Sequence, residues 1–372
     1  MGRYALLILP SANRVYAEAS TALTVAELQA FGGSVLGGRI AGAAAATIGG
    51  VPYVTFTADR VDARDAALLA NLSSVYALFQ VEDEGSDGGP LLRPVELRPL
   101  DRFDDDLMTI QKYQGKTNEQ FTKLLLNVTL LASGFAAEML DRKFAVLDPL
   151  CGRGTTLNQA LMYGFDAAGI DLDAKDFDAY AAFIQTWLKR KRVKHHAERG
   201  RLRLDSKVAG RRMRISLAAD AGDYRSGRTQ RLDLVNADTA RAAEFFKPET
   251  FDLVVADAPY GVQHGSRTAA KGLARSPVDL LAAAAPAWAS LLRSGGACGI
   301  AWNTLVARRE QAAGILADAG LDPVECEPYL GFRHRVDQAI VRDILVARKP
   351  EPGAGHATGP ARESSRAGPA AR

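Results

Sequence analysis

The segment that most restricts the possible folds is FAVLDPLCGRGTT, residues 144–156, where an apolar run of strand length meets an acidic, glycine-rich loop and then a helical pattern. Beyond it, β-type and α-type patterns alternate along the chain. The pattern predicts strands at 144–147, 167–170, 232–235, 251–256, 297–302 and 337–347, and helices at 155–162, 176–188, 277–292 and 305–319. Such alternation is typical of an α/β fold, in which helices cover both faces of a doubly wound parallel sheet.

Four regions are expected. Residues 1–100 form a small α+β domain, with strands at 4–9 and 51–57, a helix at 24–31 that Thr24 would cap, and a helix running into a strand over 62–79. Residues 101–143 form a linker and a helix, capped by Thr117 or Asn118. Residues 144–349 form the α/β domain, with an insertion at about 188–231. Residues 350–372 are rich in Pro, Gly, Ala and Ser, which predicts a disordered tail.

Composition narrows the class of protein. The chain is 47% hydrophobic and 24% charged, as globular proteins are, and no apolar run approaches the roughly 20 residues that span a bilayer. Its first residues lack the features of a signal peptide.

Cys151, Cys298 and Cys326 show no C-x-x-C spacing, so no metal site is expected and a reducing cytoplasm fits. The residues around Cys151 indicate a small packing side chain.

Positive charge is concentrated in one block. Between Leu188 and Arg214 there are twelve Lys or Arg residues against Glu198 and Asp205, which leaves the rest of the chain net negative although its overall charge is +3. Such a block is a candidate contact for nucleic-acid phosphates. The residues proposed for RNA binding are Lys189, Arg190, Lys191, Arg192 and Lys194. A solvated basic insertion without a partner is the alternative.

The glycine-rich loop predicts a cofactor site. Ligands bind beyond the carboxyl ends of the strands in a doubly wound sheet, and Gly152 and Gly154 allow a tight turn and close approach to a ligand. The loop begins with Asp148 and lacks the G-x-G-x-x-G pattern. The Asp148 carboxylate would repel a pyrophosphate and attract an ammonium group. S-adenosylmethionine (SAM) carries an ammonium group and no phosphate.

Two further acids follow strands. Asp171, after the second strand, is placed to accept hydrogen bonds from both ribose hydroxyls, and Asp238, after the third, to accept one from the adenine amino group. Either one alone is more often a cap or turn residue. Three acids at successive strand ends favour a cofactor site.

The segment DLVVADAPYG predicts the catalytic site. A buried strand ends at Asp257, Ala258, Pro259 and Tyr260. Methyl transfer to an aromatic amine needs the amino group held in line with the methyl donor. The Asp257 carboxylate and the Ala258 carbonyl can accept hydrogen bonds from that amino group, since Pro259 keeps Ala258 extended. Tyr260 can stack on the base, which contributes about 1–3 kcal/mol.

Taken together, residues 148–155, Asp171 and the D-A-P-Y-G segment resemble the class I SAM-dependent amino-methyltransferases. Among these, the chain is most similar to the RNA methylase family of tRNA guanosine N2-methyltransferases that act at position ten of tRNA. The family motif is D-P-P-Y, and Ala258 replaces its first proline. The resemblance covers about residues 110–347. It implies a Rossmann-like fold, SAM as cofactor, and a place for Thr117 near the methionine end of SAM.

The leading expectation is therefore a cytoplasmic SAM-dependent methyltransferase that modifies RNA, at guanine N2 in tRNA, with no metal and no membrane. Two alternatives stay open. A DNA adenine-N6 or cytosine-N4 methyltransferase needs the same pair of hydrogen-bond acceptors but also base flipping from a duplex. A non-catalytic SAM- or RNA-binding protein is the second alternative.

Overall fold

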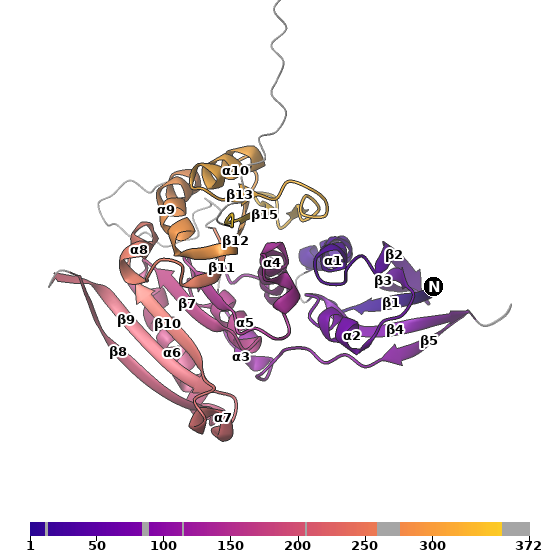
Figure 1. Cartoon of the computed structure of the whole chain (residues 1–372), viewed down its shortest axis with the longest axis horizontal. Coiled ribbons are helices and arrows are strands. Elements are labelled where there is room, and N and C mark those ends of the chain that lie inside the picture. The colour runs from indigo at the N-terminus through magenta and orange to yellow at the C-terminus, as the bar shows by residue number, and fades with distance from the viewer. Residues whose placement is uncertain (12–13, 84–88, 114, 205–206, 259–275, 352–372) are drawn as a thin grey trace, which may run out of the picture.

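The computed structural model describes residues 1–11, 14–83, 89–113, 115–204, 207–258 and 276–351. The predicted tail lies outside the described residues. The first hundred residues form a five-stranded antiparallel sheet of order β2-β3-β1-β4-β5 with two helices (Figure 1). Its elements are β1 (Gly2–Ile8), α1 (Arg14–Ser34), β2 (Ile40–Ile48), β3 (Val51–Ala58), α2 (Ala63–Leu69), β4 (Val75–Asp83) and β5 (Pro90–Val95). The β-α-β-β-α-β order is that of ferredoxin-like units.

The linker contributes the helix that joins the two halves of the molecule. Short α3 (Asp106–Thr109) is followed by α4 (Glu119–Ala132), which is capped by the Asn118 side chain on the Phe121 amide, and by the 3-10 turn η1 (Ala136–Glu138). Helix α4 packs against α1 on one side and against β11, β12 and β15 of the second sheet on the other. The described residues therefore share one continuous core across the two sheets.

The α/β domain contains the predicted alternation. Its elements are β6 (Ala145–Asp148), α5 (Thr155–Met162), β7 (Asp166–Asp171), α6 (Ala174–Arg190), β8 (Lys194–Leu204), β9 (Lys207–Ala218), α7 (Ala221–Arg225), β10 (Gln230–Asn236), η2 (Thr239–Arg241), α8 (Ala242–Phe245), β11 (Phe251–Asp257), α9 (Pro277–Leu291), β12 (Leu292–Asn303), α10 (Arg309–Asp318), β13 (Asp322–Pro323), β14 (His334–Arg335) and β15 (Val341–Arg348). Each predicted strand and helix of this domain has a counterpart here.

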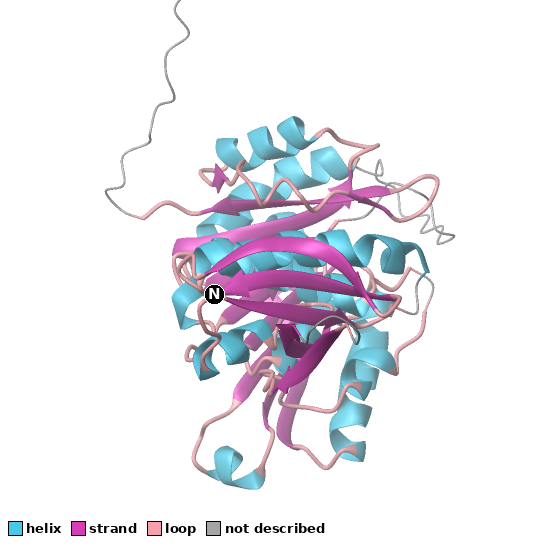
Figure 2. Ribbon diagram, turned by 90° about the vertical axis from the view of Figure 1, so that its right-hand side faces the viewer, coloured by secondary structure: helices cyan, strands magenta, loops and turns pink. Residues whose placement is uncertain are grey.

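The second sheet has the order β13-β15-β12-β11-β6-β7-β10-β9-β8. Its five central strands are parallel, and β10-β7-β6-β11-β12 correspond to sequence order 3-2-1-4-5. Strand β15 is antiparallel to β12. Helices α4, α5 and α6 cover one face and α8, α9 and α10 the other, each over its own apolar core. Figure 2 shows helices packed around and between the strands of the two sheets.

One local expectation differs from the structure, and one segment has a structure that the sequence did not predict. Thr24 does not cap a helix, because α1 begins at Arg14 and the Thr24 hydroxyl donates within the helix to the Ser20 carbonyl. The basic insertion, for which the sequence analysis predicts no secondary structure, has a regular conformation. Most of it forms the β8–β9 hairpin, which pairs with β10 and extends the sheet by two antiparallel strands. Its alternation of buried Met213, Ile215 and Leu217 with polar neighbours is a strand pattern within a highly charged stretch.

A buried polar network joins the N-terminal unit to α4. Glu27 of α1 is fully buried, and its carboxylate accepts from the Ser73 amide at 2.9 Å, the Ser73 hydroxyl at 2.6 Å and the Asn127 side chain at 2.7 Å. The Tyr163 hydroxyl donates to the Asn127 carbonyl oxygen at 2.9 Å. Burial raises the pKa of Glu27. The Ser73 and Asn127 donors are also buried, and without the Glu27 carboxylate they would lose the hydrogen-bond acceptor that takes the place of water.

Replacing Glu27 by alanine is expected to lower the free energy of unfolding by about 3 kcal/mol or more, because three buried donors lose their acceptor. Glu27→Gln keeps one acceptor oxygen and is expected to cost less. Urea denaturation measures both. Glu96→Ala removes an exposed carboxylate paired with Arg98, and serves as the control with a change within about 0.5 kcal/mol. Equal stability of Glu27→Ala and the wild type would contradict a structural role for this network.

Candidate active site

The carboxyl ends of four parallel strands gather the acids singled out in the sequence. Asp148 ends β6, Asp171 ends β7, and Asp257 ends β11, while Asp238 lies two residues beyond β10. Strands β6 and β11 are neighbours and mark the point where the strand order reverses. Ligands of open α/β sheets bind in the crevice outside this switch point. Asp148 and Asp257 therefore flank the expected ligand site.

The loop after β6 has the conformation that its glycines predict. Gly152 and Gly154 have φ angles of 48° and 80°, which side chains disfavour. A Cβ on Gly154 would lie 2.3 Å from the Tyr180 ring, whereas one on Gly152 would meet no atom within 4 Å. Gly154 is thus needed for packing, and Gly152 leaves the loop backbone open to a ligand. Cys151, next to Gly152, is buried. Burial raises the pKa of its thiol well above the usual value, so the thiol stays neutral, which agrees with its interpretation as a packing residue.

Asp148 is buried, with 3% of its surface exposed. Its carboxylate accepts from the Leu150 amide at 3.0 Å and is hydrogen-bonded to the Thr156 side chain. Burial raises its pKa to about 7, and the negative charges of Asp257 and Asp171 add to this effect. A bound cation would stabilise the ionised form of Asp148 and so lower its pKa again.

Asp171 is fixed by two backbone amides. One carboxylate oxygen accepts from Gly152 at 2.8 Å and the other from Asp173 at 2.7 Å. Burial raises its pKa to about 6, with further contributions from Asp176 and Asp173. The carboxylates give this edge of the sheet a strong negative potential, which suits a ligand with an ammonium and a sulfonium group.

The helix-capping segment before α4 reaches the end of β11. The Thr117 hydroxyl donates to the Asp257 carboxylate at 2.5 Å, across 140 residues of sequence. Thr117, expected near the methionine end of the cofactor, thus lies beside the expected catalytic acid. Residues 101–143 therefore contribute directly to this edge.

Beyond Asp257, Ala258 remains paired with β12, since its amide donates to the Ala301 carbonyl at 2.9 Å. This bond holds the backbone in line with the strand at the residue whose carbonyl is the second expected acceptor. Pro259 and Tyr260 lie outside the described residues. The stacking role of Tyr260 remains a prediction.

Asp238 has a local partner. Its carboxylate accepts from the Ala240 amide at 2.9 Å and caps the 3-10 turn η2. It lies at the same edge as the other acids, and the adenine contact remains a prediction. Asp173 caps α6, and Asp176 pairs with Arg153 at 2.8 Å.

Tyr113 is a site residue that the sequence reasoning missed. Its hydroxyl lies 3.2 Å from the Thr155 hydroxyl, and the Arg153 guanidinium lies 4.8 Å from its ring centre. Tyr113 therefore covers the glycine-rich loop from the linker side. Its position four residues before Thr117, in the segment expected near the cofactor, could have indicated this role.

The predicted RNA-binding cluster lies at the other end of the sheet. Lys189 and Arg190 are in the last turn of α6, Lys191 caps it, and Arg192 and Lys194 follow. Helix α6 begins next to Asp171 and is about 25 Å long, because each of its 17 residues rises about 1.5 Å. Lys191 is also paired with Asp104 and Asp106, each at 2.7 Å. The structure thus separates this cluster from the strand-end acids.

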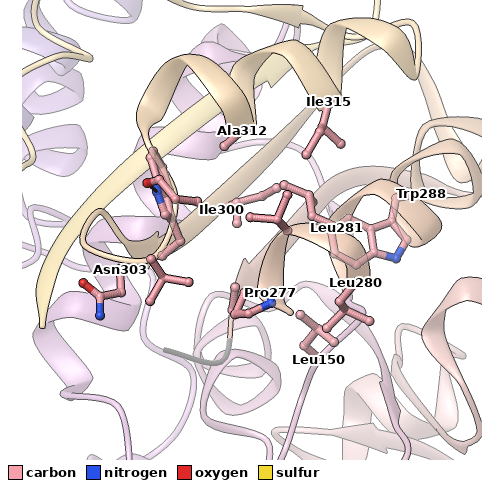
Figure 3. Close-up of a pocket in the computed structure, with 14 residues that line it drawn as sticks. Leu150, Pro277, Leu280, Leu281, Trp288, Ile300, Asn303, Ala312 and Ile315 are labelled. Atoms are coloured by element: carbon pink, nitrogen blue, oxygen red, sulfur yellow. Dashed lines mark hydrogen bonds between the residues drawn. The ribbon is translucent and has the colours of Figure 1, made fainter. Parts of the chain in front are cut away.

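An apolar pocket lies behind Ala258 between α9, α10 and β12. Figure 3 shows Leu281, Ile300 and Ile315 around it, with Leu150 of the glycine-rich loop at its border. Its volume of about 30 Å³ is close to that of a single water molecule. We interpret it as incomplete packing of the second core and not as a base-binding pocket.

Among the described residues, no helix is both long and apolar enough to cross a membrane. The same residues contain no cluster of three or more His, Cys, Asp or Glu side chains with the geometry of a metal site.

The strand order, the antiparallel β15 and the acids at the strand ends define a Rossmann-like class I SAM-dependent methyltransferase fold. Residues 131–295 match the family described as RMKL-like, methyltransferase domain. The match confirms the expected fold and the resemblance to RNA methylases.

Individual proteins show more distant similarity. The ribosomal RNA large subunit methyltransferase K/L of Photobacterium profundum is 32% identical over 126 residues, which are 32% of this chain and 18% of that protein. The chain thus spans less than a fifth of that relative. TrmN from Thermus thermophilus is 14% identical with a TM-score of 0.41, covering 94% of this chain and 100% of that one. A Burkholderia thailandensis 1,6-didemethyltoxoflavin-N1-methyltransferase is 17% identical with a TM-score of 0.35, covering 59% and 77%.

SAM is the cofactor of this domain, and the residues present fit it. Asp148 and Asp171 supply negative charge for a cationic ligand, and the open backbone at Gly152 leaves room for one. When bound, SAM supplies an activated methyl group.

Proposed function

We propose that the protein transfers a methyl group from SAM to an exocyclic amino group of an RNA base, guanine N2 in tRNA. The observation that carries this proposal is the position of Asp257, which ends the strand next to Asp148 at the switch point and is held by Thr117. A carboxylate there can accept a hydrogen bond from an amino group that faces the methyl donor. Such positioning is a major source of rate enhancement in bimolecular transfer.

The chemistry favours an amino group over a carbon or hydroxyl acceptor. An aromatic amine has two N–H donors and a lone pair delocalised into the ring. Acceptors on both N–H groups direct the lone pair toward the methyl group. Asp257 is one acceptor, and the Ala258 carbonyl is proposed as the second. Tyr260 is proposed to stack on the base.

RNA is proposed as the substrate because of the relative named above, a ribosomal RNA methyltransferase. That relative also favours ribosomal RNA as a second candidate substrate beside tRNA. The N-terminal unit, which shares its core with α4, is proposed to orient the RNA. The residues proposed for cofactor binding remain Asp148, Gly152, Gly154, Asp171, Asp238 and Thr117.

Transfer of radiolabelled methyl groups from SAM tests the proposal on three substrates: tRNA, ribosomal RNA and genomic DNA, all from a strain that lacks this gene. Nucleoside mass spectrometry then identifies the product. N2-methylguanosine in tRNA is the expected product, and the same product in ribosomal RNA would support the second candidate. Label only in DNA, or SAM binding without transfer to any nucleic acid, would contradict the proposal.

A further inference from the structure

The β8–β9 hairpin places positive charge at the edge of the sheet where the strand-end acids lie. Asn236, the last residue of β10, is paired with Arg211 of β9, and Arg211 is paired with Arg201 of β8. Asn236 donates to the Asp171 carbonyl at 2.9 Å, so Arg201 and Arg211 are level with the cofactor edge. Figure 1 shows these outermost strands with α7 at the opposite end.

The hairpin continues beyond that edge. Residues 207–210 precede Arg211 on β9 and extend about 13 Å past the end of β10, at about 3.3 Å per residue. Arg203 and Lys207 are exposed on this part, and Arg201 is exposed at its start. Arg201 and Lys207 form no ion pair with any residue that the structure describes.

Four other arginines form ion pairs that hold the hairpin against α6 and β10. They share only two carboxylates, so positive charge remains in excess. Arg199 and Arg211 both pair with Asp178 of α6. Arg212 and Arg214 both pair with Asp233 of β10, at 2.5 and 3.4 Å. Each carboxylate neutralises one of its two guanidinium groups.

One face of the hairpin borders a groove of about 290 Å³. Among its lining residues, Glu198, Arg212 and Arg214 share one face of the hairpin, whereas Arg199 and Arg201 lie on the opposite face, toward α6. Gly200, one of the lining residues, has no atom within 4 Å of the position that a Cβ would take. Planar guanidinium groups bind phosphate oxygens in a bidentate manner, so a hairpin end with arginines on both of its faces suits a phosphodiester backbone.

We propose that this end of the hairpin, through the exposed Arg201, Arg203 and Lys207, binds the phosphate backbone of the RNA substrate. The inference rests on the proposed function. Five interstrand spacings of about 4.8 Å place the hairpin about 24 Å from Asp257 along the edge. A folded RNA spans that separation, whereas a mononucleotide does not. The contact is assigned to the end of the hairpin at the cofactor edge, and not to the cluster at Lys189–Lys194, which lies at the opposite end.

The test compares two double variants that remove the same charge. Arg201→Gln with Lys207→Gln alters the hairpin, and Lys189→Gln with Arg190→Gln alters the exposed end of α6 at the opposite edge. Binding of end-labelled bulk tRNA and of ribosomal RNA is measured by fluorescence anisotropy from low to high KCl. Calorimetric SAM binding confirms that both variants fold.

The hairpin variant is expected to bind RNA at least tenfold more weakly at low salt. The slope of log K against log salt is expected to fall by about 1.4, since each lost phosphate contact on a single strand contributes about 0.7. The α6 variant is expected to match the wild type. An unchanged slope in the hairpin variant, or an equal loss in both variants, overturns the inference. Failure of the wild type to methylate any RNA overturns the proposed function instead, and the binding comparison still decides the role of the hairpin.

Discussion

Replacing Asp257 by alanine is expected to lower kcat by about 10³-fold, while SAM still binds. The loss is expected because Asp257 would hold the methyl-accepting amino group, and removing one preorganised hydrogen-bonding group from an active site typically costs 10²–10³-fold. Single-turnover methyl transfer measures the rate, and calorimetry measures SAM binding. Asp257→Asn retains an acceptor oxygen and is expected to lose less activity than Asp257→Ala.

The controls separate positioning from general damage. Thr117→Val removes the hydroxyl that donates to Asp257 at 2.5 Å and should lower kcat by less than Asp257→Ala does. Asp322→Ala alters an exposed acid of β13, far from the strand-end acids in the strand order, and should leave turnover unchanged. Wild-type turnover in Asp257→Ala would show that the carboxylate does not act in catalysis. If the wild type itself binds SAM without turnover, the non-catalytic alternative holds.

Replacing Asp148 by asparagine is expected to make the cofactor-free protein more stable at pH 8 and to weaken SAM binding by about 10–100-fold. The second effect follows because a hydrogen bond to a charged group contributes about 1.5–3 kcal/mol. Calorimetry at pH 8 measures it. Asp322→Asn, at an exposed acid of β13 away from the strand-end acids, is the matched control and should leave both properties unchanged.

The stability effect has a defined pH dependence. Burial raises the pKa of Asp148 in the folded protein to about 7, from an ordinary value of 3.8. Below pH 3.8 both the folded and unfolded states are protonated, and the residue costs nothing. As the pH rises toward and through 7, the folded state loses stability relative to the unfolded state, by up to roughly 4 kcal/mol. The advantage of Asp148→Asn should therefore grow from pH 4 to pH 8 in urea denaturation.

The same ionisation should govern the cofactor. SAM affinity of the wild type is expected to fall as the pH drops below about 7, because protonated Asp148 no longer attracts the ammonium group. Asp148→Asn should lack most of this dependence, with a remainder near pH 6 from Asp171. Identical pH profiles of SAM affinity in the two proteins would contradict the assignment of Asp148 to the cofactor.

Local sequence determined the α/β domain and most of its acidic edge. The strands and helices from residue 144 onward follow from apolar periodicity, and strand direction alone brings Asp148, Asp171 and Asp257 to one edge. Side-chain patterns and strand ends are local properties, so the sequence contains them. The β8–β9 hairpin was missed because its charge concealed the alternation of Met213 and Ile215.

Only the tertiary structure shows which residues far apart in sequence lie close together, because that depends on the direction in which each helix and strand runs. Whether a basic segment lies near the acids depends on the direction of α6, which carries Lys189 to the far end of the sheet while the hairpin returns Arg201 to the near end. The hydrogen bond from Thr117 to Asp257 spans 140 residues, and the burial of Glu27 requires α1 and α4 to pack together. A sequence pattern fixes which face of an element is apolar, but only packing of distant elements fixes which charged groups meet.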